Sequence, residues 1–370
     1  MTGKKLLKRQ KLRNNEYYDM QSVFDELYEN SLAKCEFKNL ISIITTEENI
    51  RLAYRNLKKN AGSRTPGTDG KTIADLAEMS EAELIHVVRK KFEWYQPQSV
   101  RRKDIPKGNG KTRPLGIPTI MDRLIQQCVL QVMEPICEAK FCDTSNGFRP
   151  NRGVENALAQ AEKHMQTSNL HIVIDIDIKG FFDNVNHGKL LRQIWAMGIH
   201  DKKLLCIISA MLKAEVAGIG FPEKGTPQGG IISPLLSNIV LNELDWWITS
   251  QWVGMPTRHE YSGKIHENGT KDQSKKYREL RKTKLKECYI VRYADDFKIF
   301  CKKHIDAVKL FEATKAWLKE RLGLDISPEK SKIVNLKHDY SDFLGFRIKV
   351  HKGTGNKYVV ISHIAPKALD

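Results

Sequence analysis

The stretch CYIVRYADDFKIFCKK, residues 288–303, sets two neighbouring carboxylates, Asp295 and Asp296, in the middle of an apolar run. The composition on both sides predicts two strands, which puts the acids at the tip of a hairpin. An ordinary Asp-rich turn is the plain alternative, but a tight hairpin favours a glycine, and none stands here. Adjacent carboxylates repel each other, and burial raises their pKa unless a cation neutralises them. The stretch therefore indicates a site for Mg²⁺, which prefers oxygen ligands.

A second source of carboxylates is LHIVIDIDIKGFFDNVNH, residues 170–187. Its isoleucines alternate with Val173, Asp175 and Asp177, which predicts a strand with two acids on one face. Carboxylates from two strands can bridge two Mg²⁺ ions about 4 Å apart, a pair that activates a primer 3′-hydroxyl and stabilises a leaving pyrophosphate. From the residues alone, the metal ligand of this strand is either Asp175 or Asp177.

The composition points to a polyanionic partner. Lys and Arg number 61 against 44 Asp and Glu, a net charge of +17. Nucleic acid is the first expectation for such a surplus, and an anionic membrane is the competing one. No apolar stretch approaches the roughly 20 residues of a spanning helix, and the basic N-terminus lacks the apolar core of a signal peptide. We therefore expect no membrane partner.

The seven cysteines are scattered, odd in number and without a C-x-x-C pair. The eleven histidines are also dispersed. This pattern favours reduced thiols in a cytosolic protein and disfavours a disulfide framework or a zinc site.

Helical and strand-like patterns are mixed along the chain, which predicts an α+β fold. Residues 100–118 predict a basic hairpin around a Gly-Asn-Gly turn. Residues 258–286 carry ten Lys/Arg against four Asp/Glu and few apolar residues, which predicts a basic insertion formed as a hairpin or loop. The first 35 residues are interpreted as a solvated tail or, alternatively, as an RNA-binding arm. Helices are expected at 46–60, 119–141, 188–196, 201–213 and 305–322. Two more are expected, one that follows residues 146–153 and ends at about residue 166, and one that begins at Ser233.

A series of motifs carries a family resemblance. Taken together, five of these motifs resemble the palm of reverse transcriptases: YADD, DIKGFFD, TPQGGIISPLLSN, SPEKSKI and FLGF. NAGSRTPGTDGKT, IPKGNGKTRPLGIPT, NGFRPNRG and DIDIKGFFDNVNH are similar, more narrowly, to bacterial group II intron-encoded reverse transcriptase/maturases. The resemblance covers about residues 45–350. It implies the fingers and palm of a right-hand polymerase, with an antiparallel palm sheet backed by helices.

The resemblance also implies an activity and partners. The activity is RNA-directed DNA polymerisation with two Mg²⁺ ions, for which Mn²⁺ is a substitute. The implied partners are group II intron RNA, an RNA template with a DNA primer, and dNTPs, in the cytoplasm of a bacterium. A homodimer is left open. The alternatives are an RNA-binding splicing factor (maturase) with little polymerase activity, and a retron or defence-type reverse transcriptase. An RNA-dependent RNA polymerase is disfavoured. Such enzymes usually have Gly-Asp-Asp and a polar residue near the sugar, where this chain has Ala294 and Phe182.

Metal ligands are carried over by motif. In the family an aromatic residue that gates the sugar stands five positions after the first ligand, which selects Asp177 with Phe182 over Asp175 with Gly180. The backbone carbonyl of Ile178 is an extra ligand. Asp295 is the second bridging ligand, and Asp296 a weaker or indirect one.

Substrate contacts are carried over in the same way. Lys107 and Arg113 match residues that hold the triphosphate. Lys330 matches the lysine that protonates the leaving pyrophosphate. The nucleotide pocket would be framed by Pro227, Gln228 and Gly229, and the primer end would be held by Phe343, Leu344, Gly345 and Phe346.

The expected domain order follows from the same motifs. Residues 1–40 form a basic N-terminal extension, and 41–170 with about 200–228 form the fingers. Residues 171–346 form the palm, with a basic insertion at 255–287. Residues 347–370 form a hairpin leading to a thumb/maturase domain that is expected to be missing, because no three-helix thumb fits in the last 24 residues.

Overall fold

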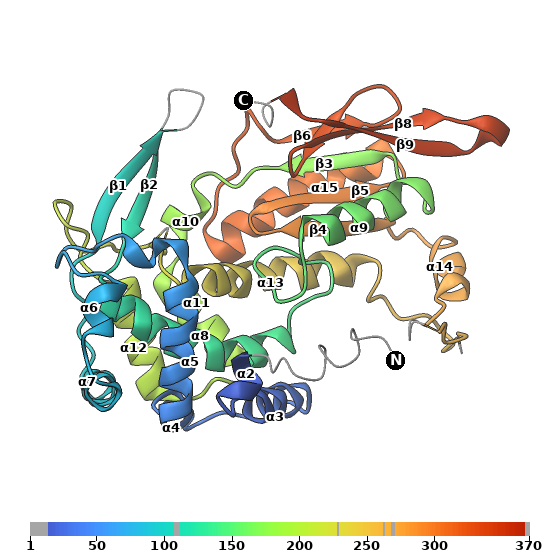
Figure 1. Cartoon of the computed structure of the whole chain (residues 1–370). Coiled ribbons are helices and arrows are strands. Elements are labelled where there is room, and N and C mark those ends of the chain that lie inside the picture. Colours follow the sequence, from blue (N-terminus) through green and yellow to red (C-terminus); the bar gives the residue numbers. More distant parts are fainter. Residues whose placement is uncertain (1–13, 107–111, 228, 262, 268–270, 367–370) are drawn as a thin grey trace, which may run out of the picture. The chain divides into compact units, whose positions relative to one another are not determined.

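The computed structural model describes residues 14–106, 112–227, 229–261, 263–267 and 271–366, with Arg113 and Asn356 described in the backbone only (Figure 1). The chain divides into two compact units. The first is Met1–Phe141 with Gly180–Val240, and the second is Cys142–Lys179 with Leu241–Asp370. The predicted mixture of helices with antiparallel sheet is confirmed. Within the described part of the chain, no helix combines the length and apolar character needed to span a membrane.

The first unit is mainly helical and contains a single described strand pair. Strands β1 and β2 are antiparallel, with Arg101 opposite Ile117 and Pro106 opposite Thr112, which confirms the two strands of the basic hairpin. The predicted Gly-Asn-Gly turn lies outside the described residues. The elements are α2 (Asn14–Tyr17), α3 (Gln21–Leu32), α4 (Leu40–Ile44), α5 (Glu47–Lys59), η1 (Ala61–Arg64), α6 (Ile73–Ala77), α7 (Glu81–Glu93), β1 (Arg101–Pro106), β2 (Thr112–Ile117), α8 (Ile120–Glu138), α10 (Phe181–Asn184), α11 (His187–Ala196), α12 (Lys202–Leu212) and α13 (Ser233–Gln251), which continues into the second unit.

Helix α8 is the central helix of this unit. Its i, i+4 apolar series is buried along its whole length, at Ile120, Leu124, Cys128, Val132 and Ile136. Thr119 caps its N-terminus, because the Thr119 side chain accepts from the Asp122 amide and its hydroxyl donates to the Asp122 carboxylate at 2.7 Å. Helices α3, α4 and α5 contact α8.

Helix α3 corrects one expectation about the N-terminal region. It buries Phe24 and Leu27, and the Ser31 hydroxyl donates to the Ile136 carbonyl of α8 at 2.8 Å. A solvated tail or free arm is therefore wrong for residues 21–32, because their apolar side chains supply packing for α8. The basic residues 1–13 lie outside the described residues.

The second unit contains two antiparallel sheets. Strand order in the larger is β4-β5-β3-β6, and β3 lies between β5 and β6 (Figure 1). The smaller has the order β7-β8-β9. The elements are α9 (Val154–Gln166), β3 (Ile172–Ile176), α14 (Ser274–Leu280), β4 (Cys288–Tyr293), β5 (Asp296–Cys301), α15 (His304–Trp317), the π-helical turn η2 (Leu318–Leu322), β6 (Lys332–Asn335), β7 (Ser341–Phe343), β8 (Phe346–Lys352), η3 (Thr354–Asn356) and β9 (Tyr358–Ile364).

A common core joins both sheets to helix α9. The helix contributes Ala157, Ala161 and Met165, and the smaller sheet contributes side chains of β7 and β8. Helix α15 contacts β3, β5 and β6 of the larger sheet. The full set of core residues is Ala157, Ala161, Met165, Leu170, Val173, Val291, Phe300, Val334, Leu336, Phe343, Ile348 and Val350. The ends of β3 and β5 are thus held by packing on several sides.

The basic insertion differs from its prediction as a hairpin or loop. It contains helix α14, and the Leu280 side chain at its end is 2% exposed. The Tyr277 ring stacks on Trp252 with centroids 6.2 Å apart. Arg281 forms a two-bond ion pair with Glu287 at 2.6 and 2.9 Å. These anchors come from residues outside the helix, so a local pattern with few apolar positions did not predict it.

Candidate active site

The tip of the β4–β5 hairpin carries Asp295 and Asp296, as predicted. Tyr293 and Asp296 are the last paired residues, so Ala294 and Asp295 form the turn. Ala294 has φ 57°, in the left-handed region that side chains disfavour. Asp295 is half-buried and Asp296 is exposed, whereas the strand residues behind them are mostly buried. The hairpin therefore delivers two carboxylates to an accessible edge.

Strand β3 supplies the other two acids. Asp175 lies in the strand, opposite Lys298 of β5, and Asp177 follows its last residue. The Asp175 carboxylate pairs with the Lys298 ammonium at 2.6 Å, with a side-chain exposure of 13%. The Asp177 carboxylate is 43% exposed and lies 3.3 Å from the Lys330 ammonium. Asp177 is therefore the more accessible of the two candidate ligands.

The backbone after Asp177 bears on the predicted carbonyl ligand. Ile178 forms an antiparallel bridge with Ile326. The two bonds of this bridge use the Asp177 carbonyl, which accepts from Ser327 N at 2.8 Å, and the Lys179 amide, which donates to the Asp325 carbonyl at 2.8 Å. The Ile178 carbonyl is therefore not used by the ladder.

All four carboxylates line one cleft of about 570 Å³. Lys298, Lys330 and Lys332 lie in the same cleft, so its wall carries both signs of charge. In the described part of the chain, no three Asp, Glu, His or Cys side chains are close enough to form a ready-made metal cage. The cleft thus offers hard oxygen donors, the type that divalent Mg²⁺ and Mn²⁺ accept, in a spaced arrangement.

The charge state of Asp296 reflects this crowding. The carboxyl group remains accessible, but the surrounding protein removes much of its hydration, and this burial is the main cause that raises its pKa to about 6. The carboxylates of Asp175, Asp295 and Asp177 raise it further, and Lys298 opposes them. A bound cation favours the ionised form of such a group. The donor set and its repulsion therefore fit a divalent cation.

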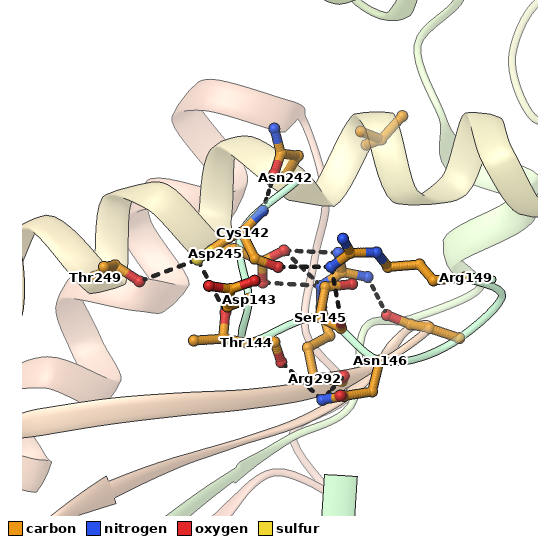
Figure 2. A network of polar contacts seen from close by, with 12 residues as sticks. Cys142, Asp143, Thr144, Ser145, Asn146, Arg149, Asn242, Asp245, Thr249 and Arg292 are labelled. Carbon is orange, nitrogen blue, oxygen red and sulfur yellow. Dashed lines mark hydrogen bonds and ion pairs between the residues drawn. The ribbon is translucent and has the colours of Figure 1, made fainter. Parts of the chain in front are cut away.

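A buried polar network supports the hairpin turn from behind (Figure 2). The Arg292 guanidinium, fully buried, donates to both oxygens of Asp245 on α13 at 2.6–3.0 Å. Its Nη1 also donates to the Ala294 carbonyl at 2.8 Å. The Arg149 guanidinium donates to the Cys142 and Ser145 carbonyls at 2.8 and 2.9 Å. This network fixes the left-handed turn that carries Asp295.

The predicted primer-binding residues form the β7–β8 turn. Phe343 is 1% exposed and belongs to the core, so only part of the motif is accessible. Leu344 and Gly345 are the two turn residues, with φ 51° and 84°. Positive φ at both positions is typical of the type I′ hairpin turn. Phe346 begins β8 and is half-buried.

A family model matches this chain. The model described as Reverse transcriptase (RNA-dependent DNA polymerase) covers residues 105–348 of the 370. The chain belongs to the reverse transcriptase family. Its members are RNA-directed DNA polymerases and generally use divalent metal ions, in keeping with the acidic cleft.

The relatives of this reverse transcriptase include intron-encoded proteins. Protein YkfC of Escherichia coli K12 is 33% identical over 340 residues, 88% of this chain and 87% of that protein. Group II intron-encoded protein LtrA of Lactococcus lactis subsp. cremoris is 32% identical over 371 aligned positions, 90% of this chain and 60% of that protein. The Putative COX1/OXI3 intron 2 protein of Saccharomyces cerevisiae is 27% identical, and the chain spans 41% of its length. The resemblance inferred from the motifs is confirmed at the level of the family.

The predicted nucleotide-binding residues of the reverse transcriptase lie in the first unit. Phe182 is half-buried and lines an apolar pocket with Pro227 and with Pro114, Leu115 and Gly116 of β2. Thr226 N donates to the Phe182 carbonyl at 2.7 Å, which holds the loop before Pro227 against α10. Lys107, Gln228 and the Arg113 side chain lie outside the described residues.

Gly229 is required by its surroundings. Its φ is 114°, and an added Cβ would lie 2.5 Å from the Gly116 carbonyl oxygen. Backbone therefore approaches backbone closely at this position, and the neighbour is β2 of the same unit.

Sequence reasoning missed several residues that hold the site together. Lys298 and Arg292 are charged residues inside apolar strands, and Asp245 and Ser341 are their partners. A buried charge requires a partner, so each basic residue within a strand was a usable signal. The identity of the partners was not, because they lie 43 and 47 positions away along the chain.

Proposed function

We propose that this chain is the RNA-directed DNA polymerase of a group II intron-encoded protein, with the fingers and palm of a right-hand polymerase. The observation that carries the proposal is the cleft lined by Asp177, Asp295, Asp296 and Lys330, which come from three sequence regions, the first more than a hundred residues before the other two. The similarity to LtrA and YkfC over about nine tenths of the chain supports the intron-encoded class.

The metal site is assigned to three carboxylates and one carbonyl. Asp177 and Asp295 would bridge two Mg²⁺ ions, with the Ile178 carbonyl as an extra ligand and Asp296 in a weaker role. When bound, such ions supply Lewis-acid activation of the primer 3′-hydroxyl and neutralise charge on the leaving pyrophosphate. Asp175 is already paired with Lys298 and is left out of this set. The accessible Lys330 ammonium, 3.3 Å from Asp177, would give a proton to the leaving pyrophosphate.

Substrate positioning is assigned residue by residue from the motifs. Phe182 would exclude a ribose 2′-hydroxyl and so favour dNTPs, while Pro227, Gln228 and Gly229 frame the nucleotide. Lys107 and Arg113 would hold the triphosphate, since a guanidinium fork and an ammonium both suit phosphate. The turn Phe343–Phe346 would hold the primer end. The RNA partner is the host intron, and the location is the bacterial cytoplasm.

A second candidate function is splicing support by RNA binding alone. It is favoured by the basic surface of residues 258–286 and by relatives such as Nuclear intron maturase 4, mitochondrial, of Arabidopsis thaliana, 24% identical over 238 residues. The acidic cleft favours the polymerase, because a binding module has no need to crowd acids on an otherwise basic protein.

Primer extension on poly(rA)/oligo(dT) with Mg²⁺ tests the proposal. We expect DNA synthesis by the wild-type chain and loss of more than about a hundredfold in Asp177→Asn and Asp295→Asn, since each removes a ligand. RNA retention on filters should stay near the wild-type level. The exposed Asp339→Asn is the matched control. Full activity in either ligand variant would reject the site, and inactive wild-type protein that still binds RNA would favour the second function.

A further inference from the structure

A lysine ammonium is buried beside the cleft. Lys298 stands in β5 between Phe297 and Ile299 and is 2% exposed. Its Nζ donates to Asp175 Oδ1 at 2.6 Å and to Ser341 Oγ at 2.7 Å. The Ser341 hydroxyl, 0% exposed, donates in turn to Asp175 Oδ2 at 2.9 Å and Oδ1 at 3.1 Å. The three polar groups therefore satisfy one another inside the unit.

The surroundings of the ammonium hold it in place. An ammonium has three N–H donors, and two are used by Asp175 and Ser341. The remaining side faces the Phe343 ring, whose centroid is 5.2 Å from Nζ. Lys298 is thus held by Asp175, Ser341 and Phe343, as expected of a positioning residue.

The three residues come from three strands in two sheets. Lys298 is in β5 and Asp175 in β3 of the larger sheet, while Ser341 begins β7 of the smaller sheet. Asp175 lies two residues before Asp177, and Ser341 lies two residues before Phe343. The network therefore connects the strand that carries the first carboxylate ligand with the turn assigned to the primer end.

We infer that Lys298, Asp175 and Ser341 form a clamp that sets the β7–β8 turn against the catalytic strands and so positions the primer 3′ end for reaction. The inference rests on the proposed function, since it takes Asp177 as ligand and the Phe343–Phe346 turn as primer site. It gives Asp175 a role as the counter-ion of Lys298. Both Asp175 oxygens accept from clamp members, which leaves fewer lone pairs for a cation than on Asp177.

Ser341→Ala is the sharpest test, because it breaks the link between the sheets without changing any charge. Thr314→Ala is the matched control, since Thr314 is also 0% exposed in the second unit and its hydroxyl donates to the Leu310 carbonyl within α15. Hydrogen exchange without metal should show faster exchange in β7 and its turn for Ser341→Ala only. The single-turnover rate of primer extension at saturating dNTP should fall about tenfold, with KM for dNTP nearly unchanged, because a small misplacement slows the chemical step.

The clamp is overturned if Ser341→Ala matches Thr314→Ala in both measurements. Asp175→Asn is a second, independent test of the clamp. We expect it to keep measurable synthesis, reduced about tenfold, because the amide oxygen still accepts from Lys298. Complete loss in Asp175→Asn together with a silent Ser341→Ala would instead make Asp175 a metal ligand. Absence of synthesis by the wild-type chain would reject the proposed function, whereas the exchange result tests the clamp without any activity.

Discussion

Two neighbouring phenylalanines of α10 have different surroundings and so different expected roles. Phe181 is 2% exposed and belongs to the core of the first unit, whereas Phe182 is half-buried and lines the pocket that contains Pro227. Their rings meet edge to face at 5.2 Å. An aromatic side chain at an accessible pocket wall can select between substrates that differ by one hydroxyl, whereas a core aromatic cannot.

Phe182→Val should therefore relax sugar selection. Removing the ring opens space where a ribose 2′-hydroxyl would otherwise clash, so ribonucleotide use relative to dNTP should rise by about tenfold or more. Single-nucleotide extension with each triphosphate gives the ratio of kcat/KM values. Phe181→Val is the matched control, expected to lower Tm and leave the ratio unchanged. If the ratio is unchanged in Phe182→Val but altered in Phe181→Val, Phe181 and not Phe182 selects the sugar.

His164 of α9 links pH to the stability of the second unit. Its ring stacks on Tyr289 at 4.6 Å and lies 5.6 Å from Phe300, with Nδ1 buried and without a hydrogen-bond partner in the described structure. Burial, with a smaller effect from the Lys163 charge, lowers the pKa of His164 to about 4. The folded state thus favours the neutral ring.

The sign of the pH effect follows directly. As pH falls from about 6.5 to 4, the unfolded chain binds a proton on this residue before the folded chain does, so stability is lost over that interval. The loss is at most about 3 kcal/mol, from the size of the shift. His164→Phe keeps the stacking and should flatten the stability curve between pH 6.5 and 4, measured by urea unfolding. The exposed His351→Gln should keep the wild-type slope, and an equal flattening in both would contradict the assignment.

At the residue scale, the sequence predicted the acids of the cleft better than their partners. Asp295 and Asp296 stand out because two charges interrupt an apolar run, and Asp177 stands out by its motif. The pairing of Asp175 with Ser341 was not predictable, because the partner is 166 positions away. The motif selects Asp177 as the ligand, whereas the role of Asp175 depends on tertiary contacts.

The β4–β5 hairpin is an element whose turn depends on another segment. The loop before α9 passes so close that a Cβ on Gly147 would lie 2.3 Å from the Ala294 amide nitrogen. Asn146 N donates to the Arg292 carbonyl at 2.8 Å, which joins this loop to β4. The turn is therefore fixed by the NGFRPNRG segment as well as by its own strands.

Gly147→Ala should displace the turn that carries Asp295. A methyl group at 2.3 Å from backbone cannot be accommodated without a shift, and a shift of about 1 Å at a catalytic group lowers rate by up to about a hundredfold. Primer extension measures the loss, with RNA binding as the second readout. Gly188→Ala is the matched control, since its nearest neighbour, Asn186 Oδ1, is 3.5 Å from the added Cβ. Comparable rates in the two variants would show that the turn tolerates movement.

Elements were predictable where their pattern is local. The i, i+4 series of α8 and the alternation of β3 are properties of short windows, and both elements occur as expected. Helix α14 has few apolar residues and depends on Trp252 and Glu287 outside it, so its window resembled a loop. The same applies to α3, whose polar composition hides one packed side.

At the scale of the whole molecule, composition gives the net charge, and the structure shows which charged residues are paired and which are exposed. The surplus of +17 exists although the cleft gathers six acids, so cations dominate elsewhere. In the insertion, Arg281 pairs with Glu287 and Lys282 with Glu279, whereas Lys271, Lys275, Arg278 and Lys284 are exposed. Paired cations are less available to phosphate, so the second set is the better candidate for an RNA contact.

Replacing Lys271, Lys275, Arg278 and Lys284 by Gln should weaken RNA binding across sequences. RNA binding releases fewer counterions for each phosphate contact that is lost. The slope of log K against log salt should therefore flatten by about 0.7–0.9 per contact. Titrations from low to moderate salt measure it. The control replaces the exposed Lys302, Lys303, Lys309 and Lys315 by Gln. It removes the same charge from the two residues before α15 and from two positions within that helix. A flattening confined to the first set locates the contacts on the insertion, whereas equal slopes in both variants would mean that only net charge matters.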